Sequence, residues 1–580
     1  MQKKIMNIKS NYDKYPSIKV EGNVISGWDK ILTFLEGKGG NLKIAIECYH
    51  GVNSNEIKNA FGNKTSFFDT TSLFKSEEEI IRLTEPDITD DPIFGYITKL
   101  TLEDFLDEDK IKSVREEIQQ SNEGLTVVCG PGALLCLPDA DIKIYADMAR
   151  WEIQLRMRKN EVNGLGVENK NQPVNLQYKR GFFVDWRVCD KFKKECLRQC
   201  DFLLDTNKPD SPNLVDMVTM QKCFTQAVKQ PFRVVPFFDP GPWGGHWMEE
   251  VCDLETEGKP NHAWCFDCVP EENSVLFEIG ETIIEVPSID LVFFRSRELL
   301  GPKVEARFGK EFPIRFDFLD TIGGGNLSLQ VHPDTGFIQE NFGMHYTQDE
   351  SYYILDAKED TKIYLGVKKD CDAEDFINQL NEAQKSGPPF DADKFVNTFP
   401  VKKHDHFLIP AGTVHCSGKN TMVLEISATP YIFTFKMWDW GRLGLDGKPR
   451  PINIDRATKV IDYSINTDVA ENELINQAEK VNEGEGWIEE KTGLHNREFI
   501  ETRRHWFTKP VLHDTEGIVN VLNLVEGREV LVESPTHAFS PFIVHYAETF
   551  IVPAEVGEYV IRPYGESEGQ KVATIKAYVR

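Results

Sequence analysis

Long apolar runs and a secretion signal are both missing from this sequence. Its longest apolar stretch, residues 125–137, is broken by Gly130, Pro131 and Gly132 and is too short to cross a bilayer. Residues 1–16 include lysines, but no apolar segment of the kind that directs secretion accompanies them. We therefore expect a cytoplasmic protein with no membrane partner.

Basic residues are also outnumbered by acidic ones. The chain has 66 Lys and Arg against 93 Asp and Glu, a formal net charge of −27, which argues against nucleic acid as a main partner. A local basic pocket could still hold a small anion. The 12 cysteines are scattered over 580 residues, as is typical of reduced thiols rather than a disulfide framework. This length suggests two to four domains.

Apolar runs and helical patterns alternate in the first part of the chain. Residues 42–48, 125–129 and 142–145 are predicted strands, and helical patterns occupy residues 77–84, 104–120 and 148–159. This order predicts a parallel sheet covered by helices. We assign residues 1–232 to this α/β domain.

The α/β domain distantly resembles the P-loop nucleoside and sugar kinases. Residues 44–55 lie where a phosphate-binding loop would follow the first strand, yet they contain only Gly51 of the required glycines and no lysine. Arg150, Arg156 and Arg158 resemble the arginines of a kinase lid helix, although they also fit a solvated basic face. We expect a degenerate kinase-like domain used for docking or dimerisation, in which this helix could still hold an anion.

Short strands separated by Gly, Pro and Asn turns predominate after residue 231. This pattern predicts β-barrels or sandwiches, with helical insertions at residues 373–395 and 456–482. Residues 406–415 (HFLIPAGTVH) are echoed by residues 549–558 (TFIVPAEVGE), which suggests two related barrels in tandem. The alternative is a chance match between two ordinary strands.

Two barrel domains follow from this echo. We assign residues 233–500 to a first barrel and residues 501–580 to a second. The first copy ends on His415 where the second has Glu558, so we expect metal binding in the first barrel alone. The predicted fold class is therefore a multidomain protein, α/β at its N-terminal end and mainly β afterwards.

Four polar residues of the first barrel could hold a metal ion. Strict alternation in residues 327–333 puts Gln330 and His332 on one strand face, Glu350 lies in a second predicted strand, and His415 follows a Pro-Ala-Gly turn. Two imidazoles and one carboxylate with an open position are a known catalytic pattern. The separations of 2, 18 and 65 residues follow no local spacing code, and each His could also be an ordinary polar residue.

These segments resemble, in order, the motifs of type I phosphomannose isomerases, which are cupin-fold enzymes. The matching stretches are WGG at 243–245, LSLQVHP at 327–333, ESYYILDA at 350–357, FLIPAGTVH at 407–415, and WDWGR at 438–442 with GKPR at 447–450. The resemblance covers about residues 233 to 580, more than half of the chain.

The resemblance implies a ligand set and a reaction. Gln330, His332, Glu350 and His415 would bind one Zn²⁺ ion per chain. The enzyme would interconvert mannose 6-phosphate and fructose 6-phosphate, or a related sugar phosphate, through a cis-enediol. Its partner would be this small molecule, and a homo-oligomer is compatible with the sequence. A metal ion would stabilise the developing charge, and cationic side chains would hold the phosphate.

Three cations of the family pattern are altered here. Gln348 replaces the Lys before the metal-binding Glu, Asp317 replaces a Lys upstream of the metal strand, and Lys436 aligns with the catalytic Arg. Lys cannot reproduce the two-pronged hydrogen bonding of Arg. Lys436 and Arg442 are the expected catalytic cations, although Arg442 could equally be a structural ion-pair partner. The true sugar and the retention of activity stay open.

Two other functions fit the same residues. Two His and one carboxylate also form the ferrous site of cupin oxygenases. The missing lysines favour a non-catalytic sugar-phosphate sensor. Separately, Cys265 and Cys268, with His262 just before them, have the spacing of a zinc knuckle, but the sequence offers no fourth ligand. We expect these cysteines to be buried thiols.

Overall fold

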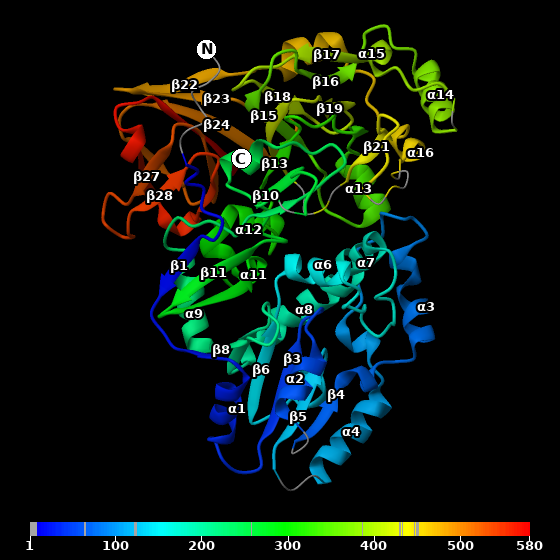
Figure 1. Ribbon diagram of the computed structural model, residues 1–580, viewed down its shortest axis with the longest axis vertical. Coiled ribbons are helices and arrows are strands. Elements are labelled where there is room, and N and C mark those ends of the chain that lie inside the picture. Colours follow the sequence, from blue (N-terminus) through cyan, green and yellow to red (C-terminus); the bar gives the residue numbers. More distant parts are fainter. Residues whose placement is uncertain are drawn as a thin grey trace.

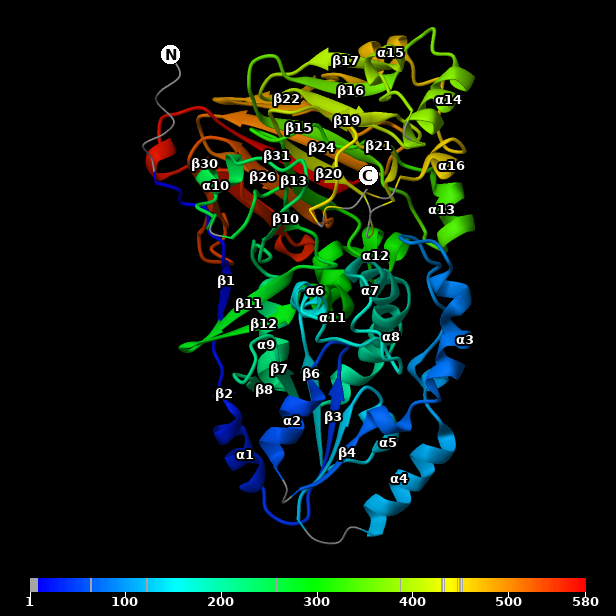
Figure 2. The same cartoon turned by 45° about the vertical axis from the view of Figure 1, so that its right-hand side comes forward.

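The computed structural model describes residues 9–580 apart from short gaps. The gaps are residues 63–64, 121–123, 257, 386, 429–430, 432, 446, 448–449 and 451. Figures 1 and 2 show an elongated molecule with an α/β unit at one end and β-rich units at the other. Among the described residues, no helix is both long and apolar enough to traverse a lipid bilayer.

A seven-stranded sheet forms the centre of the α/β unit, in the order β2-β8-β7-β6-β3-β5-β4. Its strands are β2 (Val24–Ser26), β3 (Lys43–Cys48), β4 (Ser66–Asp69), β5 (Thr126–Gly130), β6 (Ile142–Asp147), β7 (Phe202–Asp205) and β8 (Asn213–Asp216). The neighbours from β4 to β7 are parallel, which confirms the parallel sheet expected from the sequence. A kinase-like identity for this unit is not confirmed.

Both faces of this sheet are covered, because β3 is apolar on each side. Ile44 and Ile46 pack into one apolar cluster and Ala45 into another, as an unbroken apolar run predicts. The covering helices include α1 (Trp28–Glu36), α2 (Ser54–Phe61), α3 (Glu77–Ile88), α4 (Glu108–Gln120), α6 (Arg150–Arg158), α7 (Val174–Arg180), α8 (Trp186–Cys196) and α9 (Met217–Ala227). The expected helices at 77–84, 104–120 and 148–159 correspond to α3, α4 and α6.

Two open sheets face each other in the first β unit, in the orders β18-β15-β20-β13-β10-β9 and β17-β16-β19-β14-β21. The strands of the six-stranded sheet are β9 (Phe237–Asp239), β10 (Trp264–Cys268), β13 (Arg315–Asp320), β15 (Glu350–Ala357), β18 (His406–Ile409) and β20 (Thr421–Ser427). Those of the five-stranded sheet are β14 (Leu329–Val331), β16 (Lys362–Val367), β17 (Val396–Pro400), β19 (His415–Ser417) and β21 (Phe435–Trp438). The predicted helical insertion at 373–395 contains α14 (Ala373–Gln384) and α15 (Ala392–Phe395).

A second pair of sheets follows, in the orders β22-β23-β24-β31-β26-β29 and β25-β30-β27-β28, and encloses its own apolar core. The strands are β22 (Glu479–Gly484), β23 (Trp487–Lys491), β24 (Ile500–Phe507), β25 (Val511–Asp514), β26 (Asn520–Glu526), β27 (Glu529–Glu533), β28 (Phe542–His545), β29 (Thr549–Val552), β30 (Glu558–Pro563) and β31 (Val572–Val579). None of the sheets in the described part of the chain closes on itself, so the tandem barrels are not confirmed.

The two echoing sequences nevertheless occupy matching places. Residues 406–415 begin in β18, an edge strand of a six-stranded sheet, and end in β19 of the facing sheet. Residues 549–558 likewise begin in β29, an edge strand of the other six-stranded sheet, and end at β30 of its facing sheet. The sequence echo therefore corresponds to a structural one.

The expected helical stretch at residues 456–482 is wrong over most of its length. Only short helical turns occur there, α16 (Ile454–Ala457) and α17 (Thr467–Val469) among them. β22 and β23 pair with each other and then with β24, so the C-terminal sheet already includes strands that precede residue 501. All six residues of β22 are exposed, and such a polar edge strand lacks the apolar alternation that marks a strand in a sequence.

The segment after residue 270 packs against the α/β unit. β1 (Ser17–Val20), β11 (Ser274–Ile279) and β12 (Thr282–Pro287) form a three-stranded sheet, and α11 (Ile289–Leu300) follows. Just before β11, Glu271 accepts hydrogen bonds from Arg150 at 2.5 Å and Arg187 at 2.6 Å. Figures 1 and 2 show α6 and α7 at this junction, close to the first β unit.

Candidate metal centre

Three of the four predicted ligands meet between the facing sheets of the first β unit. His415 begins β19, His332 follows β14, and Glu350 begins β15 on the opposite sheet. All three side chains are at most 1% exposed. In the described part of the chain, they form the one group of His, Cys, Asp and Glu whose ligand atoms all lie within 4.8 Å of one another.

The distances around Glu350 are those of a compact cluster. Its Oε2 lies 3.2 Å from Nε2 of His332, and its Oε1 lies 2.9 Å from Nε2 of His415. Gln330, paired with His415 in the strand register, places its Nε2 3.3 Å from Nε2 of His415. Rotating this amide by half a turn would present its oxygen to the same point. The structure thus brings together all four residues that the sequence singled out.

Backbone carbonyls orient both imidazoles. Nδ1 of His332 lies 3.0 Å from the carbonyl oxygen of Phe433, and Nδ1 of His415 lies 2.9 Å from that of Thr413. A carbonyl only accepts hydrogen bonds, so each Nδ1 carries a proton and each Nε2 faces Glu350. Histidines that bind metals are commonly held in this way.

The atoms at the centre lack the partners that a buried site normally supplies. Nε2 of His332 and Oε1 of Glu350 are both buried without a hydrogen bond among the described residues. Burial alone would raise the pKa of Glu350, yet the neighbouring imidazole of His332 lowers it well below its usual value. An ionised carboxylate facing two ring nitrogens fits a divalent cation, and this donor set suits zinc.

Gln348 supports the carboxylate, a role that the sequence did not reveal. Its Nε2 donates to Oε2 of Glu350 at 2.9 Å, and its Oε1 accepts from the backbone N–H of Phe433 at 3.0 Å. Both Glu350 and His332 are therefore tied to the segment around Phe433. In the sequence, Gln348 is notable only as the replacement for a family lysine.

Two more carboxylic acids lie on the same sheet face as Glu350. The register places Asp317 opposite Glu425, and Glu425 opposite Tyr352. Burial raises the pKa of Asp317 to about 6 and that of Glu425 well above its usual value. Nε of Arg315, two residues before Asp317 on β13, lies 3.3 Å from Oδ1 of Asp317. An acid with an adjacent arginine thus replaces the family lysine.

Lys436 lies opposite one of the predicted ligands in the strand register, whereas Arg442 is engaged in ion pairing. Lys436 is opposite Gln330 in the register between β21 and β14, and burial together with Arg450 lowers its pKa to about 7. Arg442 donates to Oδ1 of Asp439 at 2.6 Å and to the carbonyl oxygen of Asn326 at 2.5 Å. These bonds favour the structural alternative for Arg442.

The arginines of α6 are paired as well. Arg150 contacts Asp190 at 2.5 Å, and Arg156 contacts Glu152 at 2.8 Å. Arg158 forms two hydrogen bonds of 2.7 Å with Asp239. The helix is therefore neither a solvated basic face nor an unpaired anion site.

The predicted thiols of β10 are buried, as expected. Cys265 and Cys268 are at most 1% exposed, and they do not belong to the metal-ligand group found among the described residues. His262 lies 3.5 Å from Glu249. No zinc knuckle is therefore seen in this part of the described chain.

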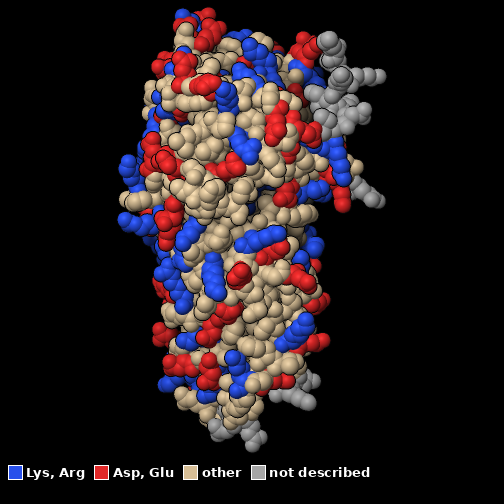
Figure 3. Space-filling view, turned by 90° about the vertical axis from the view of Figure 1, so that its left-hand side faces the viewer, with Lys and Arg blue, Asp and Glu red and all other residues tan. Residues whose placement is uncertain are grey.

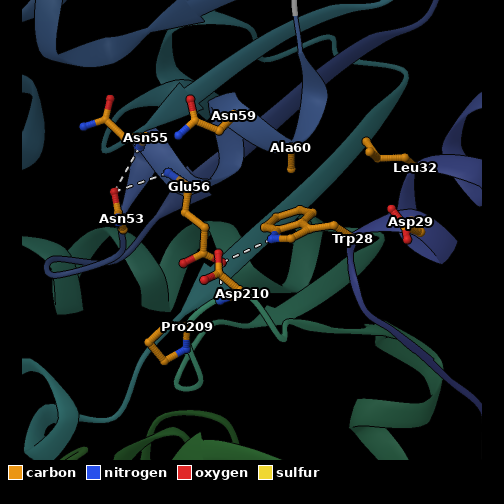
Figure 4. A pocket seen from close by; sticks show the side chains of 10 residues that line it. All are labelled: Trp28, Asp29, Leu32, Asn53, Asn55, Glu56, Asn59, Ala60, Pro209 and Asp210. Carbon is orange, nitrogen blue, oxygen red and sulfur yellow. Dashed lines mark hydrogen bonds between the residues drawn. The ribbon is translucent and has the colours of Figure 1, made fainter.

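Clefts of the α/β unit lie apart from the metal cluster. One, of about 640 Å³, lies where a phosphate-binding loop would be and is lined by residues such as Gly51, Asn53 and Asn163. A second, shown in Figure 4, contains Trp28, whose Nε1 donates to Glu56 at 3.2 Å. On the face shown in Figure 3, acidic and basic side chains are interspersed.

Comparison with known proteins assigns the chain to a family. The chain is 30% identical over 233 residues to the probable mannose-6-phosphate isomerase GmuF of Bacillus subtilis, covering 40% of this chain and 68% of that protein. The chain belongs to the mannose-6-phosphate isomerase family. The mannose-6-phosphate isomerase of Streptococcus mutans is 26% identical over 221 residues, which are 38% of this chain and 64% of that protein.

A solved structure and a family model also match the chain. A crystal structure of the mannose 6-phosphate isomerase from Bacillus subtilis aligns with a TM-score of 0.48 and 19% identity, covering 60% of this chain and 99% of that one. Residues 27–229 match a family described as a domain of unknown function, DUF8485. The matched residues include strands β3 to β8 of the α/β unit.

Proposed function

We propose that this chain is a metal-dependent aldose–ketose isomerase that interconverts mannose 6-phosphate and fructose 6-phosphate, or a related sugar phosphate. The observation that carries the proposal is the cluster of His332, Glu350 and His415, in which both Nε2 atoms face the carboxylate of Glu350. Its occurrence in a member of the mannose-6-phosphate isomerase family supports the reaction type.

Gln330, His332, Glu350 and His415 would hold the metal, with Zn²⁺ as the preferred ion and one ion per chain. A bound divalent cation supplies Lewis acidity toward the sugar oxygens. Gln348 keeps the carboxylate of Glu350 in place through its 2.9 Å hydrogen bond. The carbonyls of Phe433 and Thr413 fix the imidazole tautomers.

Lys436 is the residue that we assign to proton handling. Isomerisation removes a proton from C2 of the aldose and returns one to C1. A group whose pKa is about 7 is present in both protonation states near neutrality, as acid–base catalysis requires. Arg442 would hold Asp439 and the Asn326 loop in place, rather than touch the sugar.

A coupled assay for fructose 6-phosphate tests this proposal. Zinc-loaded protein should convert mannose 6-phosphate, and a chelator should abolish turnover. Glu350→Ala should remove activity together with the metal, because one of three strong donors is lost. Turnover that survives complete metal removal would contradict the proposal.

A sugar-phosphate sensor is the second candidate. It is favoured by Asp317 standing in place of a family lysine and by the deep burial of the three metal ligands. Binding of mannose 6-phosphate without turnover, on fully metal-loaded protein, would support the sensor. Stoichiometric iron with oxygen-dependent turnover would instead support the oxygenase alternative.

A further inference from the structure

Arg315 has an unusual environment for a buried arginine. It lies on β13 and is 7% exposed. Its Nε lies 3.3 Å from Oδ1 of Asp317, but both atoms lack a hydrogen bond of proper geometry. No described residue accepts a hydrogen bond from the two terminal NH₂ groups of Arg315. The ring of Phe266 lies 5.3 Å from its guanidinium. Burial alone would lower the pKa of Arg315, but the carboxylates of Asp317, Glu425 and Glu272 raise it above its usual value.

Such a side chain requires an acceptor. A guanidinium carries five N–H donors and stays charged, so burying it without hydrogen-bond acceptors is costly even where carboxylates lie nearby. Buried polar groups in native proteins are almost always paired, and an exception indicates a ligand or another missing partner. The planar arrangement of its donors matches the oxygens of a phosphate or carboxylate.

The strand register places Arg315 in line with the metal cluster. Glu350 pairs with Ser427 on β20, and Ser427 pairs with Arg315 on β13. The three residues therefore form one row across the inner face of the sheet. Strands are about 4.8 Å apart, so Arg315 and Glu350 are separated by about 10 Å at the backbone. A sugar bound at the cluster could extend its phosphate along this row.

We propose that Arg315 is the phosphate anchor of this site. The inference rests on the proposed function and adds a binding residue for its substrate class, the phosphate monoesters of sugars. Arg315 supplies a cation on the same face of β13 as Asp317, two residues away. The carboxylates of Asp317, Glu425 and Glu272 compete with the phosphate for the guanidinium, and Asp317 has the ion-pair contact, at 3.3 Å.

Isothermal titration calorimetry tests the anchor without requiring turnover. Zinc-loaded protein is titrated with inorganic phosphate and, separately, with mannose 6-phosphate. Arg315→Gln should weaken both affinities by about 10- to 100-fold, because charge-assisted hydrogen bonds are lost. Metal content should be unchanged. Arg562→Gln, a control in the exposed pair with Glu533, should leave both affinities unchanged.

Substituting Asp317 should change phosphate affinity in the opposite direction. Asp317→Asn should strengthen phosphate binding, because one competing carboxylate is gone. If Arg315→Gln fails to fold because Asp317 is left unpaired, the double variant Arg315→Gln/Asp317→Asn removes both charges and should still bind phosphate more weakly than Asp317→Asn alone. Equal affinities in these two folded proteins would overturn the proposal.

The anchor and the isomerase proposals can fail separately. If the unmodified protein binds mannose 6-phosphate through Arg315 but does not convert it, the isomerase proposal fails and the anchor stands. If the protein turns over mannose 6-phosphate and Arg315→Gln keeps the same KM, the anchor fails and the isomerase stands.

Discussion

At the scale of single residues, the candidate metal site depends on hydrogen bonds that orient its ligand side chains. His332 and His415 each donate Nδ1–H to a backbone carbonyl, and Gln348 donates to Glu350. Local alternation was sufficient to predict Gln330 and His332 on one strand face. Gln348 and Arg315 were not predicted, because their roles depend on contacts between distant strands.

Removing one imidazole should release the metal. His332→Ala should lose most of its bound zinc, because too few strong donors are left. Metal analysis of the purified variant by mass spectrometry measures this. Glu558→Ala, at the echoing position of the second β unit, is the matched control and should keep its zinc. Unchanged zinc content in His332→Ala would count against the ligand set.

Removing the hydrogen bond from Gln348 to Glu350 should also weaken zinc binding. Gln348→Ala should lower zinc affinity by about 10- to 100-fold, as is usual when a group that orients a metal ligand is removed. Competition with a chromogenic chelator measures this affinity. Gln339→Ala, an exposed glutamine of α13 (Thr335–Phe342), is the control. Equal affinities in both variants would show that Gln348 does not orient Glu350.

At the scale of elements, strands and helices with clear periodicity were predictable, and those stabilised by distant pairing were not. β3, β5 and β6 were expected because their apolar runs are continuous. β22 was expected to be helical, since its sequence is polar and its strand conformation depends on pairing with β23. Barrel closure was inferred from the pattern of short strands and from the internal echo, and the sheets do not confirm it.

The connection after β5 should make stability depend on pH. Glu47 on β3 accepts backbone N–H groups of Gly132 and Leu134, and burial raises its pKa to about 8. The folded state then binds the proton more tightly than the unfolded state. This contribution is present below pH 4.5 and is lost as pH rises through about 8.

Chemical denaturation at pH 5 and pH 8.5 tests whether the free energy of unfolding falls as pH rises. The protein should lose several kcal/mol of unfolding free energy over this range from Glu47 alone. Glu47→Gln stays neutral and should show a smaller loss. If the variant and the unmodified protein have the same pH slope, Glu47 is not the group responsible.

At the scale of the whole molecule, the α/β unit and the first β unit are joined close to the metal centre. Arg150 and Arg187 bind Glu271, and the hydroxyl of Tyr431 donates to the carbonyl oxygen of Ile93 at 2.9 Å. The ring of Phe433, whose carbonyl orients His332, stacks against Phe94. The sequence could not predict this junction, because its partners lie more than 80 residues apart.

Breaking this junction should destabilise the protein. Glu271→Ala leaves the buried Arg150 and the half-buried Arg187 without their shared partner, and we expect a loss of about 3–5 kcal/mol. The loss of stability should appear as a lower Tm in thermal unfolding. Glu533→Ala, which breaks the more exposed pair with Arg562, should cost less than about 1 kcal/mol. Similar losses in both variants would show that Glu271 is not critical to the junction.

The most direct test of the metal centre is a crystal structure of zinc-loaded protein with anomalous data collected at the zinc edge. We predict a single strong peak per chain at about 2.0–2.2 Å from Nε2 of His332, Nε2 of His415 and a carboxylate oxygen of Glu350. A stoichiometric zinc ion bound elsewhere, with this cluster empty, would contradict the account.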